Sequence, residues 1–172
     1  MTKLLKVLFL ILFLPTATFA GEVSNDFINK NLSNNDLYKK FKERSDAMNN
    51  FFSGTVDIKT TDNRYKFYYA GREDTKSGQF YIFYIEENNP VILVSEETTF
   101  YIKEFDQTQT FAPRSVEIED LNSDGLNEIT LKGTNWGTGS RKHFIKAYFL
   151  KFDDKKPSFN GIDYSVKIEK FR

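Results

Sequence analysis

Acidic and amide side chains recur at alternate positions between residues 120 and 128. Asp120, Asn122 and Asp124 carry side-chain oxygens at the first, third and fifth positions, Gly125 is at the sixth, and Glu128 is at the ninth. Calcium takes roughly six to eight oxygen ligands, and a loop with this spacing can wrap one ion. Glycine at the sixth position permits the tight curl because it adopts positive φ without Cβ strain. The sequence therefore predicts one Ca²⁺ site.

The expected ligands are oxygens from five residues of this loop. Asp120, Asn122 and Asp124 would contribute side chains, Leu126 its backbone carbonyl, and Glu128 a carboxylate directly or through water. Three carboxylates that face one point repel each other unless a cation lies between them. The alternative is a metal-free hairpin turn, because Asp, Asn and Gly also favour turns. A bound ion could also have a structural role only.

The loop differs from an EF-hand, which has a bidentate Glu at the twelfth position, where this chain has Leu131. Its flanks at 115–119 and 129–132 alternate as strands do. Residues 115–140 resemble the strand–loop–strand calcium sites of FG-GAP/VCBS-type repeats, which usually read Asp-x-Asp-x-Asp-Gly-x-x-Asp. Asn122 and Glu128 depart from that pattern but remain oxygen donors. The resemblance implies a small exported β domain, and some compact relatives with a single motif resemble calcium-containing lysozyme inhibitors.

Apolar residues recur with a period of two from about residue 51 to the C-terminus, with turn residues between the runs. This spacing predicts about eight or nine short strands linked by hairpins, and hence an antiparallel all-β domain. A propeller-like or sandwich arrangement fits, but the single motif and the length argue against a complete propeller. The run 80–85 is apolar at every position and should be central. Polar residues at 106–114 and glycines at 133–141 predict two loops.

One N-terminal helix is expected before the strands, over residues 34–49. Ser33 and Asp36 have the spacing of a capping box, with Asp in place of Glu. Leu37, Phe41 and Met48 then recur at helical spacing and form a narrow apolar stripe. The helix should therefore lie on the outside of the domain and cover one face.

The first twenty residues predict a secretory signal peptide. Lys3 and Lys6 precede an apolar run at 7–14, and small residues lead to Ala20, after which we expect cleavage. The run is shorter than the ~20 residues that span a bilayer, so no membrane span is expected after cleavage. Residues 21–172 should form one periplasmic or secreted domain. The chain has no cysteine, which excludes disulfides and a lipid-modified cysteine.

Charge gives no indication of a polyanionic partner. The 24 basic and 24 acidic residues balance, and loss of Lys3 and Lys6 would leave a net charge of −2. Neither nucleic acid nor an anionic membrane is therefore expected as a partner. His143 is the only histidine, and no serine has the context of a catalytic nucleophile. We expect a binding protein and no enzyme, with His143 as an ordinary strand residue.

Trp136 lies among three glycines, in a segment where Asn135 and Arg141 could also contact a partner. Exposed aromatic anchors are common in recognition loops, although Trp136 could instead pack on a neighbouring strand. The partner would be a protein, such as a lysozyme, or a glycan of the cell envelope. The alternatives are an envelope glycan hydrolase, which needs an acid pair in a cleft, and a purely structural envelope component.

Overall fold

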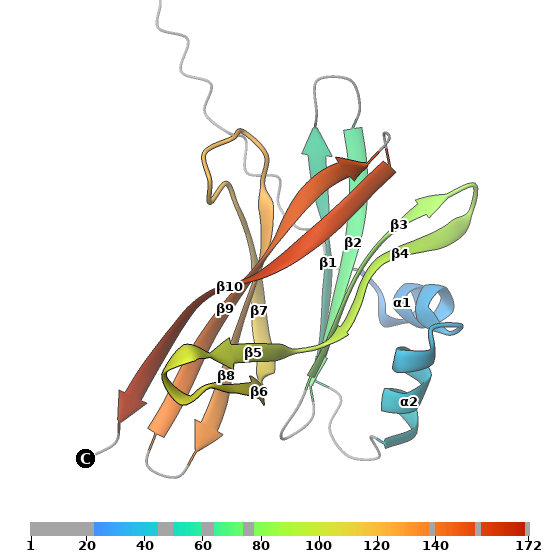
Figure 1. The fold of residues 1–172 in the computed structure, drawn as a ribbon. Coiled ribbons are helices and arrows are strands. Elements are labelled where there is room, and N and C mark those ends of the chain that lie inside the picture. Colours follow the sequence, from blue (N-terminus) through green and yellow to red (C-terminus); the bar gives the residue numbers. More distant parts are fainter. Residues whose placement is uncertain are drawn as a thin grey trace, which may run out of the picture.

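Two four-stranded antiparallel sheets dominate the fold (Figure 1). The computed structural model describes residues 23–44, 50–59, 64–73, 78–137, 140–153 and 156–170. The predicted signal peptide at 1–20 lies outside these residues. Within them, no helix is long and apolar enough to cross a membrane.

The first sheet is a meander of the first four strands. It runs in the order β1 (Asn50–Lys59), β2 (Arg64–Glu73), β3 (Gly78–Glu86) and β4 (Asn89–Glu97). Strand β3 has neighbours on both sides, and Phe80, Tyr81, Ile82 and Phe83 are all buried. The prediction that the apolar run 80–85 is central is confirmed, because consecutive strand residues point to opposite faces and both faces are covered.

The second sheet contains the last four strands in the order β10-β9-β8-β7. Their bounds are β7 (Ala112–Glu119), β8 (Glu128–Gly137), β9 (Ser140–Asp153) and β10 (Lys156–Lys170). Between the two sheets the chain forms β5 (Thr99–Ile102), the 3₁₀ turn η1 (Lys103–Phe105) and β6 (Gln107–Thr110). We call residues 99–110 the arm, because β5 and β6 pair only with each other.

The two sheets share one core rich in aromatic residues, so the antiparallel domain is a sandwich. The inner face of the first sheet contributes Val56, Phe67, Phe80 and Ile82, and the second contributes Ile129, Leu131, Phe144 and Tyr148. The rings of Phe80 and Tyr148 meet across the interface with centroids 5.0 Å apart. Aromatic side chains bury a large area each, which explains why a chain without disulfides can hold two sheets together.

Two short helices replace the single helix predicted for residues 34–49. They are α1 (Asn25–Leu32) and α2 (Asp36–Arg44), and they pack on the face of the first sheet that points away from the second (Figure 1). The side chain of Asn35 accepts the Tyr38 amide at 3.0 Å, so Asn35 caps α2 and Ser33 instead ends α1. Of the predicted stripe, Leu37 is partly buried against the cluster that contains Ile28, Leu32 and Tyr38. The Phe41 side chain and Met48 lie outside the described part of the chain.

Two predicted loops are largely strands. Residues 106–114 were expected to form a loop, but they contain β6 and the first residues of β7. Residues 133–141 contain the end of β8 and the start of β9. Both segments are rich in polar residues or glycines, which is why loops were predicted there. Pairing with neighbouring strands instead gives these residues an extended backbone.

Candidate metal centre

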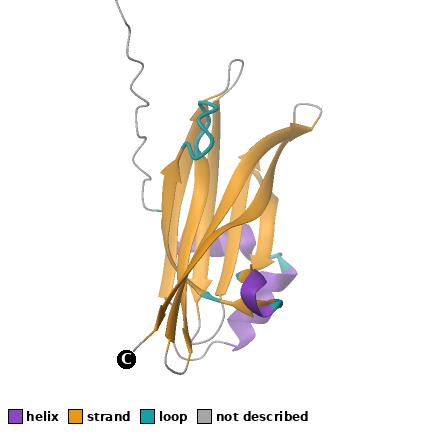
Figure 2. Ribbon diagram, turned by 60° about the vertical axis from the view of Figure 1, so that its left-hand side comes forward, coloured by secondary structure: helices purple, strands orange, loops and turns teal. Residues whose placement is uncertain are grey.

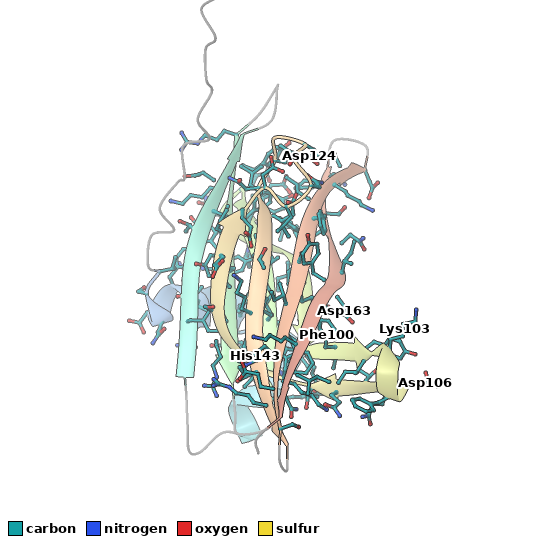
Figure 3. The ribbon with its side chains drawn as sticks, turned by 90° about the vertical axis from the view of Figure 1, so that its left-hand side faces the viewer. Phe100, Lys103, Asp106, Asp124, His143 and Asp163 are labelled. Carbon is teal, nitrogen blue, oxygen red and sulfur yellow. The ribbon has the colours of Figure 1, made fainter. Side chains whose placement is uncertain are left out.

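The predicted calcium loop connects β7 to β8 and stands at one end of the second sheet (Figure 2). Its strand flanks are confirmed, since Glu119 is the last residue of β7 and Glu128 is the first of β8. Asp124 lies at this end of the sheet in Figure 3, while His143 lies near the other. The loop is therefore held by two paired strands, with Leu126 packed against the core and residues 122–125 exposed.

The Asp120 carboxylate organises the loop by accepting backbone amides from residues further along it. Its Oδ1 accepts the Asp124 amide at 3.2 Å and its Oδ2 accepts the Gly125 amide at 3.0 Å. Asn122 Oδ1 also accepts the Asp124 amide, at 3.0 Å. These bonds fold the chain back around its own polar side chains, and each carboxylate oxygen keeps a second lone pair for another partner.

Positive φ angles produce the tight curl at two positions. Gly125 has φ +86°, as the sixth-position glycine predicted, and Ser123 has φ +59°. A non-glycine residue in the left-handed region is uncommon and costs backbone strain. Beyond the curl, Asp124 Oδ1 accepts the Leu126 amide at 2.8 Å and Asp124 Oδ2 accepts an Asn122 amide proton at 2.8 Å.

Glu128 is the buried acid of the site. Its exposed fraction is 2%, and its Oε2 accepts the Leu121 amide at 2.6 Å, which ties the start of the loop to its end. Burial raises the pKa of Glu128 above its ordinary value of 4.5, and the carboxylates of Asp124 and Asp120 raise it further. Two backbone amides lower it in part. The site therefore disfavours the ionised carboxylate unless a cation or a proton compensates for it.

A second like charge faces Glu128 across the strands. Glu119 on β7 is its direct partner in the β7–β8 register. Like charges directly opposite in an antiparallel pair destabilise it. The loop and the strand ends beside it thus concentrate negative charge, as expected of a site for a divalent cation.

The oxygen donors fit calcium by type and spacing, but their present positions do not form a complete shell. Among the described residues, no three His, Cys, Asp or Glu side chains are grouped so that they could hold a metal ion. The Asp carboxylates turn toward loop amides and Glu128 toward Leu121. Binding would therefore require the carboxylates of Asp120, Asp124 and Glu128 to approach a common centre.

The raised pKa of Glu128 predicts how stability depends on pH without calcium. A carboxylate whose pKa is raised by folding stabilises the protein below its unfolded pKa of about 4.5, and this contribution is lost as pH rises through the folded pKa. In a chelator, Glu128→Gln should therefore become more stable relative to wild type as pH rises from 4 to 7. Urea unfolding at several pH values measures this, and parallel curves for the two proteins would contradict it.

The segment proposed for recognition lies at the far end of β8 from the calcium loop. Asn135 and Trp136 are residues of β8, where they pair with Lys142 and Arg141 of β9. Ten strand residues separate the two ends of β8, which is about 30 Å at ~3.3 Å per residue. The Trp136 side chain lies outside the described part, and a recognition role for Asn135, Trp136 and Arg141 remains a prediction.

Position 133 in this segment requires a glycine because neighbouring atoms pack closely against it, and the residue is not part of a turn. A Cβ at this position would overlap the Phe111 ring and lie 2.6 Å from the Ala112 carbonyl oxygen. Gly133→Ala should therefore lower the free energy of unfolding by about 1–3 kcal/mol, because backbone or a buried ring must move. Chemical denaturation tests this. Gly125→Ala, where no atom lies within 4 Å but φ is positive, should cost less, about 1 kcal/mol.

His143 is a strand residue, as predicted. Its Nε2 lies 3.0 Å from Glu169 Oε2 on β10. Its hydrogen bond to Glu169 lowers the pKa of that exposed carboxyl. Lys167 is the direct partner of His143 in the β9–β10 register, and its Nζ lies 3.6 Å from Glu169 Oε1, two residues further along β10.

The structure also contains a partly buried polar network around Lys146, which was not predicted from the sequence. Lys146 Nζ lies 2.8 Å from Glu96 Oε1 and 4.0 Å from Asp163 Oδ1. The Tyr148 hydroxyl donates to Glu96 at 2.7 Å, and burial with the Glu96 carboxylate raises the pKa of Tyr148 well above its usual value. One signal was available, because Lys146 occupies a core-facing position between Phe144 and Tyr148 in the period-two pattern.

No family model, no curated protein and no solved structure matches this chain.

Proposed function

We propose that the loop at residues 120–128 binds one Ca²⁺ and that the domain is an exported binding module. The observation that carries the calcium proposal is the fold of the loop around the Asp120 carboxylate, which accepts amides four and five residues further on. Hydrogen bonds also link Asn122 to Asp124 and Asp120 to the Asp124 amide, so these three residues lie within one short curl. Asp120, Asn122 and Asp124 would hold the ion, with the Leu126 carbonyl and Glu128 completing the shell.

Electrostatics supports the same proposal. Burial raises the pKa of Glu128, and the carboxylates of Asp124 and Asp120 raise it further. Glu119 lies directly opposite Glu128 in the β7–β8 register. A divalent cation would neutralise most of the repulsion among these carboxylates. Part of the favourable free energy of binding would therefore come from removing that repulsion. In this proposal calcium fixes the β7–β8 connection and supplies no catalytic chemistry.

Calorimetric titration of chelator-treated protein with CaCl₂ tests the proposal directly. We expect one site, with a dissociation constant of about 10⁻⁴–10⁻³ M as in other extracellular modules. MgCl₂ should bind more weakly, because Mg²⁺ demands near-ideal octahedral geometry and loses its water reluctantly. The absence of both binding heat and a calcium-dependent change in melting temperature would contradict the proposal.

For the partner, we propose a protein or a glycan of the cell envelope, as the family resemblance implies. A lysozyme is the first protein to test, by measuring the lysis of cell walls by lysozyme with and without this protein. Pull-down from envelope extract, with calcium or with chelator, tests other partners. The distance between the calcium loop and residues 135–141 implies that contact through those residues would depend little on calcium.

The glycan-hydrolase alternative needs two carboxylates free to exchange protons with a substrate. Outside the loop, Glu96 and Asp163 form an acid pair, but Lys146 lies between them and Tyr148 bonds Glu96. This arrangement favours charge pairing over proton transfer. We therefore keep the binding module as the proposal, and release of sugars from purified cell walls would favour the enzyme.

A further inference from the structure

The arm covers part of the aromatic core but belongs to neither large sheet. Phe100 and Ile102 on its inner side are buried, and the Phe100 ring centroid lies 5.0 Å from that of Phe144 on β9. On its outer side, Tyr101 and Phe105 are 48% and 54% exposed. Because a lone two-stranded sheet is at most marginally stable in water, the arm depends on its contacts with the sandwich.

Asp163 provides a polar contact that holds β5 against the second sheet. Its Oδ2 accepts the Tyr101 amide at 2.9 Å. Asp163 lies where the β9–β10 register shifts, between Asp163 and Ser165. Figure 3 shows Asp163 above the base of the arm, near Phe100, while Lys103 and Asp106 mark the arm's projecting tip.

Lys146 connects this contact to the interface between the sheets. Its Nζ lies 4.0 Å from Asp163 Oδ1 and 2.8 Å from Glu96 Oε1 on β4. Lys146 is only 9% exposed, so its ammonium group depends on these two carboxylates for compensation. A chain of contacts therefore runs from the Tyr101 amide through Asp163 and Lys146 to Glu96, and it joins the arm to both large sheets.

We propose that the arm is a strap that opens as a unit without global unfolding, and that Asp163, positioned by Lys146, keeps it closed. Opening uncovers the Phe144 ring, on which Phe111 also stacks at 5.3 Å. The arm is also held by the buried Phe100 and Ile102, and by Asn135 and Lys142, which donate to the Thr110 carbonyl at 2.6 Å and to Gln109 Oε1 at 2.7 Å. Opening must break these contacts but leaves both large sheets paired, so it costs less free energy than global unfolding. The proposal does not depend on calcium, because no residue of the loop takes part in it.

Amide hydrogen exchange at Tyr101 measures the opening, with Ile82 on the central strand β3 as the reporter of global unfolding. Asp163→Ala should speed exchange at Tyr101 about tenfold or more relative to Ile82, because the amide loses a charged acceptor. Lys146→Met should also speed it, because Asp163 then loses the ammonium group 4.0 Å from its Oδ1. Lys132→Met is the matched control, since Lys132 pairs with Glu117 on the solvent side. It should leave Tyr101 exchange unchanged.

Two outcomes would overturn the strap. Exchange at Tyr101 could rise only in step with exchange at Ile82, or Lys146→Met could behave like Lys132→Met. If Asp163→Ala fails to fold, Asp163→Asn keeps an oxygen for the Tyr101 amide but loses the charge. It should still speed exchange at Tyr101 relative to Ile82, by a smaller factor, and unchanged exchange in this variant would equally contradict the proposal.

Discussion

Replacement of Glu96 by valine should lower the free energy of unfolding by about 2–3 kcal/mol. Loss of one partner from a buried ion pair typically costs about 3–5 kcal/mol, because the other charge remains without compensation. The expected cost is lower here because the Glu96 side chain is partly exposed and Asp163 remains 4.0 Å from Lys146. The buried Tyr148 hydroxyl also loses its acceptor, which adds to the cost. Urea unfolding at pH 7 gives the value.

Two further variants show whether the lost stability comes from the uncompensated Lys146 charge or from a general loss of packing. Glu117→Val removes the acid of an exposed pair with Lys132 and should cost only about 0–1 kcal/mol. The double variant Glu96→Val with Lys146→Met removes both charges and should recover much of the lost stability. A cost for Glu96→Val no greater than that for Glu117→Val would show that the buried pair contributes little.

The strand content of the domain could be predicted from the sequence because each strand carries its own period-two pattern. Val56 and Ile58 are both buried on one face of β1, and the unbroken apolar run of β3 marks a strand covered on both sides. The loop at residues 120–128 could also be predicted, because its determinants are local. Its turn-forming residues and Gly125 lie within nine consecutive positions, and its hydrogen bonds stay within that segment.

Features that depend on distant contacts could not be predicted in the same way. Gly133 resembled a loop glycine, yet the approach of Phe111 and the Ala112 carbonyl requires it within a strand. The Lys146 network joins residues 96, 146 and 163, which only the packing of two sheets brings together. The predicted start of the helix was wrong for a local reason. Both Ser33 and Asn35 can cap a helix, and Ser33 already ends α1, so Asn35 caps α2.

Calcium should raise the melting temperature of the wild-type protein but not that of Asp124→Ala. An ion present at about a hundredfold its dissociation constant stabilises the folded state by about 2.7 kcal/mol, and for a domain of this size that corresponds to very roughly 5–11 °C. Asp124 is exposed and would supply one of the three central oxygens. Without calcium its loss removes only the bonds to Leu126 and Asn122 at the surface. Melting curves in CaCl₂ and in chelator measure the difference.

Asp153→Ala is the matched control for this experiment. Asp153 is an exposed acid at the end of β9, so its removal changes the net charge equally while the loop stays intact. The calcium-dependent rise should therefore persist in Asp153→Ala. If it also persisted undiminished in Asp124→Ala, calcium would bind elsewhere, and the charge gathered around Glu128 would need another explanation. A rise lost in Asp124→Ala alone would assign the ion to the loop at residues 120–128, whose backbone already folds around its own acidic side chains.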